Sequence, residues 1–121
     1  MPQFQVLDEY FESLRTQDWQ GLARCLAEGV HRSGPYLDVI RGRPAYVDYL
    51  AKVIPALAGY DLKVARVRAL APDCAVAELS EFAEVGGVRR EFPELILFDF
   101  DETGSIARID IYMKQPPRHP Q

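Results

Sequence analysis

Apolar and polar positions alternate with the period of an α-helix over residues 3–16. Apolar side chains recur every three or four positions, and charged side chains occupy the opposite face. A second pattern of this kind begins after Asp18, which is suited to cap a helix N-terminus, and Gly29 marks its end. The sequence therefore predicts two amphipathic helices joined by a very short connection. Their apolar positions are Phe4, Leu7, Tyr10, Phe11, Leu14, Trp19, Leu22, Ala23 and Leu26.

The pattern becomes short and extended between residues 30 and 40. Ser33, Gly34 and Pro35 interrupt it, which predicts two brief extended segments around a turn. A third helical pattern starts at residues 42–44, where proline suits the first turn of a helix. Pro55 and Gly59 end this third helix.

The second half of the chain has the alternation of β-strands. Turn-forming residues separate the segments, and Gly86-Gly87 predicts a tight hairpin. Pro93 lies within one segment and indicates a β-bulge or a strand edge there, because proline has no N–H to donate. The four strands that we expect cover residues 60–70, 74–85, 88–100 and 105–114.

This order of elements predicts an α+β fold. Helices first and an antiparallel meander afterwards favour three N-terminal helices packed on the concave face of a strongly bent, mostly antiparallel sheet, giving a cone-shaped α+β barrel. The interior of such a barrel is suited to bind a small molecule. We assign residues 1–115 to a single domain, since 121 residues is near the commonest domain size. We expect residues 116–121 to form a disordered tail.

Composition and charge restrict the partners. Lys and Arg number 14 against 18 Asp and Glu, and the net charge of -4 repels phosphate, so we expect no nucleic acid partner. No apolar run approaches the ~20 residues that cross a bilayer, and the N-terminus lacks a signal-peptide pattern. We therefore expect no membrane partner and a cytoplasmic protein. Cys25 and Cys74 share no metal-binding spacing with each other or with a histidine, and no glycine-rich phosphate loop is present, so we expect neither a metal nor another cofactor.

Three segments carry a resemblance that covers nearly the whole chain: YFESLRTQDWQGLARCLAEGV, VIRGRPAYVDYL and LFDFDETGSIARIDIYM. Together they resemble the nuclear transport factor two-like superfamily, in particular its SnoaL-like branch, which includes polyketide cyclases, ketosteroid isomerases and limonene epoxide hydrolases. The resemblance implies a ligand pocket and a homodimer. Tyr10 falls where ketosteroid isomerases have an oxyanion-hole tyrosine. Gly34 stands where those enzymes have the general-base aspartate, and Ile96 stands near the place of their second acid.

Glu94 is the leading candidate for chemistry. Strand alternation places it on the same face as Phe92, Ile96, Phe98 and Phe100. An acid among aromatic side chains has its charged form disfavoured, which raises its pKa and suits it to general acid or base catalysis. The alternative is that a bulge at Pro93 turns Glu94 towards solvent or an arginine.

His31 and Arg32 are adjacent, so alternation directs one of them inwards. His31 would provide a proton shuttle, whereas Arg32 would bind an anion or a carbonyl group. Asp38 either faces the mouth of the pocket together with Arg41 or Arg43, or is a surface carboxylate paired with a neighbouring arginine.

Glu78 and Glu81 lie on opposite faces of their strand, so at most one of them faces inwards. The pattern leaves open which of the two does so.

These residues support three hypotheses of function. An enzyme would act on a small apolar molecule that contains oxygen, with Glu94 or His31 moving a proton and Tyr10 donating a hydrogen bond. A binding protein would use the same pocket without turnover. An interaction scaffold would form a homodimer through the sheet, at residues such as Ile109 or Tyr112. The residues expected to contact the ligand are Arg32, Tyr36, Asp38, Phe92 and Ile96.

Overall fold

The computed structural model describes residues 2–115. In chain order the elements are α1 (Pro2–Thr16), α2 (Trp19–Arg24), β1 (Leu26–Ser33), β2 (Val39–Arg41), α3 (Arg43–Val53), β3 (Asp61–Ala71), β4 (Cys74–Val85), β5 (Val88–Phe100) and β6 (Ile106–Met113). All the expected helices and strands are therefore present in the expected order. The expected tail, residues 116–121, lies outside the described residues.

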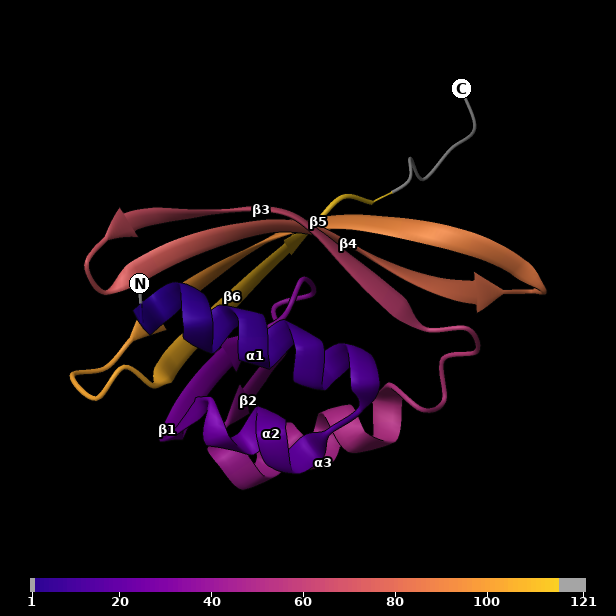
Figure 1. Cartoon of the computed structure of the whole chain (residues 1–121). Coiled ribbons are helices and arrows are strands. Elements are labelled where there is room, and N and C mark those ends of the chain that lie inside the picture. The colour runs from indigo at the N-terminus through magenta and orange to yellow at the C-terminus, as the bar shows by residue number, and fades with distance from the viewer. Residues whose placement is uncertain (1, 116–121) are drawn as a thin grey trace.

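The six strands form one mixed sheet in the order β2-β1-β6-β5-β4-β3. Neighbouring strands are antiparallel except β1 and β6, which are parallel. Figure 1 shows α1 lying under the long strands, with α2 and α3 further from them; α3 contacts β1 and β2, and α2 contacts α1 and α3. The α+β class is confirmed, and one face of the sheet is covered by helices.

An aromatic cluster holds α1 against the sheet. Phe98 on β5 is fully buried, and its ring meets Tyr10 and Phe11 of α1 edge to face, with centroid distances of 5.5 and 5.8 Å. This arrangement suits the quadrupoles of aromatic rings and contributes about 0.5–1.5 kcal/mol per pair beyond simple burial. The helix-facing side of β5 is thus fixed next to the N-terminal helix.

The second helix is shorter than the periodicity predicts. Asp18 caps it, with its Oδ1 accepting a hydrogen bond from the Gly21 N–H at 3.0 Å. However, Leu26 and Gly29 belong to β1 and not to the helix, because the chain from Leu26 onwards pairs with β6. Pairing with a strand distant in sequence overrides the local helical pattern, whose last apolar position still becomes buried.

Pro93 marks a strand edge and not a bulge. The β4–β5 register runs without a shift through Ser80 and Pro93. On the other side, the β5–β6 pairing begins only at Glu94, so β5 has no second neighbour before that point. The missing N–H of proline therefore costs no ladder hydrogen bond. The regular register also keeps Glu94 on the inward face.

No helix within residues 2–115 is both long enough and apolar enough to span a membrane.

Candidate functional site

A cavity of about 220 Å³ lies between the helices and the inward face of the sheet. Side chains from α1, α3, β1, β4, β5 and β6, and from the loop between β1 and β2, line it. The predicted site residues that the structure brings together there are Tyr10, Arg32, Tyr36, Asp38, Glu94 and Ile96.

Glu94 is the most deeply buried acid in this cavity. Its side chain is only 4% exposed, and no hydrogen-bond donor among the described residues reaches either carboxylate oxygen. A buried carboxylate without donors is strongly disfavoured relative to the neutral acid. The inward position predicted by strand alternation is therefore the one that the structure shows.

Glu81 lies next to Glu94 on the neighbouring strand. Leu79 pairs with Glu94 and Glu81 pairs with Phe92, so the two acids are diagonal neighbours on the inward face. Burial is the largest cause that raises the pKa of Glu94, to about 10, and the neighbouring Glu81 adds to the rise. Glu94 is therefore protonated at neutral pH.

The sequence did contain the signal that places Glu81 inside. A two-residue turn at Gly86-Gly87 pairs Val85 with Val88, and counting back along both strands pairs Glu81 with Phe92. Glu81 therefore shares the face of Phe92 and Glu94. Alternation along β4 shows that Glu78 and Glu81 lie on opposite faces, but it does not show which of the two faces inwards. That choice depends on the register between β4 and β5.

Tyr10 is hydrogen bonded to another tyrosine and not to Glu94. Its hydroxyl lies 2.6 Å from the hydroxyl of Tyr46 on α3, and both residues are at most 2% exposed. Burial raises the pKa of Tyr46 to about 12 and the pKa of Tyr10 well above its usual value. Both phenols stay protonated at neutral pH. Since one proton serves the mutual hydrogen bond, the other remains free for a ligand.

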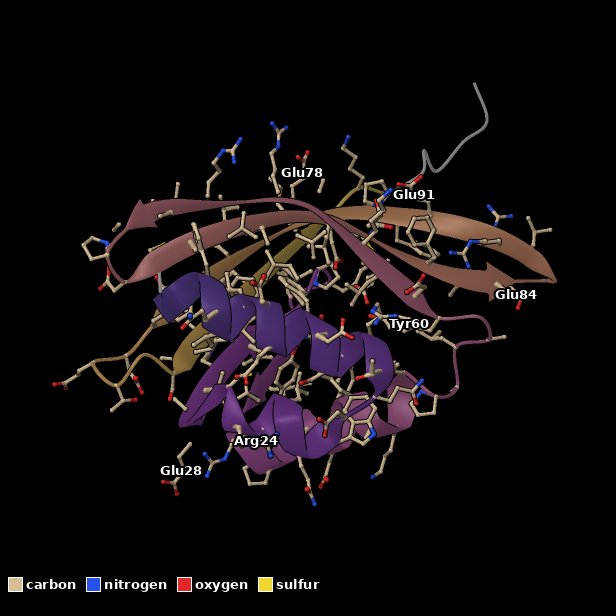
Figure 2. All side chains as sticks on the ribbon, in the orientation of Figure 1. Arg24, Glu28, Tyr60, Glu78, Glu84 and Glu91 are labelled. Atoms are coloured by element: carbon tan, nitrogen blue, oxygen red, sulfur yellow. The ribbon has the colours of Figure 1, made fainter. Side chains whose placement is uncertain are left out.

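Tyr60 holds Glu81 in place. Its hydroxyl donates a hydrogen bond to Oε2 of Glu81 at 2.5 Å. Burial and the charge of Glu81 raise the pKa of Tyr60, so this donor also stays protonated. Figure 2 shows Tyr60 on the helix side of the sheet, whereas Glu78 and Glu91 project from the opposite side.

Arg32 points inwards and His31 does not. Arg32 is 6% exposed, and its Nη1 donates to Oδ2 of Asp38 at 2.6 Å. Its guanidinium lies over the rings of Tyr49 and Tyr46, at 5.1 and 6.0 Å from the centroids, which favours a cation at this position. Asp38 therefore pairs with Arg32, and not with Arg41 or Arg43, the two arginines that the sequence suggested beside it.

Asp38 carries its charge at the mouth of the cavity. Burial raises the pKa of its carboxyl, but the hydrogen bond from Arg32, the backbone hydrogen bonds and the charge of Arg32 together outweigh this, and the net effect is a lowered pKa. Gly34 packs directly against this ion pair, and a Cβ at that position would overlap the Asp38 carboxylate. A side chain at position 34 would therefore displace the Asp38–Arg32 ion pair.

Two of the expected residues, His31 and Phe92, do not line this cavity, and Tyr36 lines only its mouth. His31 does not line the cavity, because the alternation of β1 places it on the opposite face from Arg32, so the expectation of a proton shuttle there is corrected. Tyr36 lies at the mouth, 72% exposed, with its hydroxyl near the side chain of Gln115. Phe92 lines an adjoining cavity.

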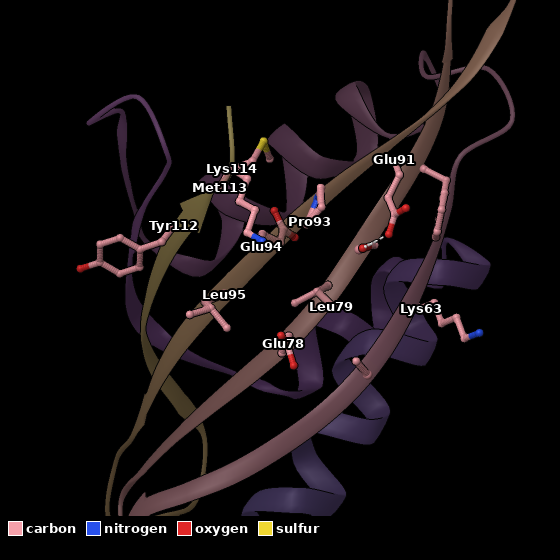
Figure 3. A pocket seen from close by; sticks show the side chains of 13 residues that line it. Lys63, Glu78, Leu79, Glu91, Pro93, Glu94, Leu95, Tyr112, Met113 and Lys114 are labelled. Atoms are coloured by element: carbon pink, nitrogen blue, oxygen red, sulfur yellow. Dashed lines mark hydrogen bonds between the residues drawn. The ribbon is translucent and has the colours of Figure 1, made fainter. Parts of the chain in front are cut away.

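The outward face of the sheet carries a groove of about 520 Å³, whose lining shares Leu79, Glu94 and Met113 with the first cavity. Figure 3 shows it crossing the strands, with the Tyr112 ring at one end and the Lys63 side chain at the other. Tyr112 and Leu95 in this groove are 64% and 47% exposed. Ile109, which the sequence suggested for the same face, is fully buried and faces inwards.

Within residues 2–115, no group of three or more His, Cys, Asp or Glu side chains is arranged to hold a metal ion.

Residues 7–109 match the family model of the SnoaL-like domain. No curated protein matches the sequence. Among solved structures, the chain is similar to an LEH-like epoxide hydrolase of M. tuberculosis, with a TM-score of 0.81, 18% identity and coverage of 93% of this chain and 83% of that chain.

An NTF-2 like protein of unknown function from Burkholderia xenovorans gives a TM-score of 0.79 and 16% identity over 98% of this chain and 88% of that chain. A Mycobacterium tuberculosis protein in complex with estradiol-17beta-hemisuccinate gives a TM-score of 0.78 and 16% identity, over 94% of this chain and 98% of that chain. At these identities the likeness concerns the fold.

Proposed function

Since this chain belongs to the SnoaL-like domain family, we propose that it is an enzyme that transfers protons, without a cofactor, to and from a small, largely apolar molecule that contains oxygen. The reaction is an isomerisation, a cyclisation or a hydrolysis. The site is the cavity between α1, α3 and the sheet, and Glu94 and Glu81 carry the protons.

The single observation that carries this proposal is the buried acid pair. Glu94, without a donor to stabilise its anion, faces the cavity as a neutral acid beside the carboxylate of Glu81. Carboxyl pairs that share one proton separate into an acid and a base, which is the arrangement that proton transfer needs. In such a site the acid protonates the substrate oxygen while its partner accepts a proton.

The proton balance of one turnover closes within the pair. Glu94 gives its proton to the ligand oxygen, and Glu81 takes a proton from a ligand C–H or from a water that attacks the ligand. The proton then passes from Glu81 to Glu94, which restores the starting state. Arg32 favours the first step, because its positive charge lowers the cost of forming the Glu94 carboxylate.

The tyrosines orient the ligand. The hydroxyl proton that Tyr10 and Tyr46 do not use between themselves is available to the same ligand oxygen. Oxygen-containing apolar ligands are also consistent with the similar structures, one of which is an epoxide hydrolase and another of which holds a steroid derivative.

Glu94→Gln tests the proposal directly. The amide keeps the size of the side chain but has no acidic proton, so turnover of small epoxides, enones or ketones should fall by about 10²–10⁴-fold while ligand binding persists. Glu91→Gln is the matched control, since Glu91 lies on the same strand with an exposed side chain on the outward face. Equal turnover in both variants, or an effect of Glu94→Gln on affinity alone, would identify a binding protein without catalysis.

The same proposal includes a homodimer formed through the outward groove. Exposed Leu95 and Tyr112 provide apolar surface there. Sedimentation analysis of the wild-type protein and of Tyr112→Glu tests this interface. A wild-type dimer that becomes a monomer in the variant would support the interface, and a wild-type monomer would refute it.

A further inference from the structure

A second cavity adjoins the candidate site. It also measures about 220 Å³ and shares Tyr36, Leu57, Glu81 and Met113 with the first cavity in its lining. The shared side chains show that the two spaces are neighbours. Here we call the first space, which holds Glu94, the acid chamber, and the second space the apolar chamber.

The two chambers differ in chemistry. In the apolar chamber, Phe92, Ala83 and Val85 contribute hydrocarbon surface. Among its polar groups, the Tyr60 hydroxyl and the Glu81 carboxylate are hydrogen bonded to each other, and the Tyr36 hydroxyl at the mouth is hydrogen bonded to Gln115. The acid chamber has the Glu94 carboxyl, for which the described residues offer no donor, and the tyrosine pair. A ligand therefore finds its polar partners at one end only.

Size supports a ligand that occupies both chambers. Each space is smaller than the ~300 Å³ at the lower limit of typical small-molecule sites, whereas the two together exceed it. A molecule confined to the acid chamber would leave an adjoining apolar surface without a partner, which loses favourable burial.

Charge restricts the polar end of the ligand. The cation of the acid chamber, Arg32, is already paired with Asp38, and Glu81 places a negative charge beside Glu94. An anionic group next to Glu94 would be repelled, whereas an uncharged oxygen would accept the Glu94 proton.

We infer that this site takes an elongated, uncharged molecule, with a carbonyl or epoxide oxygen at one end in the acid chamber and a hydrocarbon body in the apolar chamber. This inference rests on the proposed function for the position of the reacting oxygen. The apolar chamber then selects substrates by length.

Methyl ketones from 2-hexanone to 2-tridecanone, with carboxylates of equal length, test the inference by competition binding observed by NMR. The dissociation constant of the ketones should fall on the order of threefold to fourfold for each added methylene until the apolar chamber is full. The carboxylates should bind more weakly at pH 7. Ketone affinity that stops increasing at the same length in wild type and chamber variants, or tighter carboxylate binding, would overturn the inference.

The chamber variants are Ala83→Phe, which fills the apolar chamber, and Val85→Trp, which is safer for folding because Val85 is 48% exposed. In both, the increase in affinity should end at a shorter ketone. Val88→Trp is the matched control, since Val88 faces Val85 across the same hairpin, is 57% exposed and lines neither chamber. A control that behaves like the chamber variants counts against the inference.

The same ketone series separates this inference from the proposed function. Chain-length selection without any turnover that depends on Glu94 would leave the inference in place and refute the proposed function. Turnover that depends on Glu94, without chain-length selection, would support the proposed function and refute the inference.

Discussion

The two faces of the β4–β5 hairpin carry glutamates in opposite protonation states. On the outward face, Glu78 is exposed and paired with Arg66, whose hydrogen bond lowers the pKa of Glu78. On the inward face, burial and the neighbouring Glu81 raise the pKa of Glu94 to about 10. The residue type is the same and the strands are neighbours in one hairpin. The side of the sheet alone decides whether a glutamate is a solvated anion or a neutral acid poised for proton transfer.

Substitutions that remove an apolar side chain should give the largest difference in unfolding free energy between the two faces. Phe98→Ala removes a fully buried ring that contacts Tyr10 and Phe11, and should reduce the free energy of unfolding by about 3–5 kcal/mol. Leu95→Ala on the outward face, at 47% exposure, should cost about 0.5 kcal/mol. Urea denaturation of both variants measures this, and equal costs would contradict the burial difference.

The pH dependence of stability should have opposite signs for the two acids. The folded pKa of Glu94, about 10, lies above its ordinary value of 4.5, so its stabilising contribution is complete below pH 4.5 and is lost as pH rises towards 10. Replacement by glutamine removes this loss. The stability of Glu94→Gln relative to wild type should therefore increase with pH, by up to about 1.4 kcal/mol per pH unit.

Glu78→Gln is the control for this series. The lowered pKa of Glu78 gives a contribution that is present above its ordinary value of 4.5 and is lost as pH falls. The variant should differ from wild type only slightly, with the difference disappearing at low pH. Denaturation curves from pH 4 to pH 9 compare all three proteins. A constant difference between Glu94→Gln and wild type would show that Glu94 does not change its protonation on unfolding.

The two arginine–carboxylate pairs should show a smaller difference in their contributions to stability. Asp38→Asn weakens the partner of the buried Arg32 and should cost about 1 kcal/mol, less than a buried charged hydrogen bond, because the Asp38 side chain is 44% exposed. The exposed pair of Arg66 and Glu78 should contribute little, so Arg66→Gln should leave the unfolding midpoint almost unchanged. Thermal unfolding at low and high salt measures both, and only the exposed pair should respond strongly to salt.

The smallest effect on folding should come from Tyr112. Because Tyr112 is 64% exposed on the outward groove, Tyr112→Ser should change the unfolding free energy of the monomer by less than about 0.5 kcal/mol. The proposed dimer should nevertheless weaken, which sedimentation at several concentrations would detect. A large loss of monomer stability would mean that this face is packed within the chain.

Much of the fold could be predicted from the sequence, because helix and strand periodicity is a local property. The expected strands and the first and third helices match the structure closely. Residues 26–29 are the exception: they have a helical pattern but form the start of β1, because strand pairing with β6 is worth more than local propensity. Alternation along β5 also correctly placed Glu94 and Ile96 inside.

The candidate site was only partly predictable, because its contacts join residues far apart in the chain. Tyr10 was expected to need a buried partner, but Tyr46 was identified only by the packing of α3 against α1. The choice between His31 and Arg32 required the direction of β1, and the neighbour of Glu94 required the β4–β5 register.

By itself, then, the sequence determined the order of elements and the family to which the chain belongs. It favoured the inward position of Glu94 but left open a bulge at Pro93, which the β4–β5 register excludes. The tertiary structure alone decided that Arg32 is paired with Asp38 and that Tyr60 holds Glu81. The physical reason is that periodicity fixes which face a side chain takes. The protonation state depends instead on the charges, donors and solvent that register and packing bring around it.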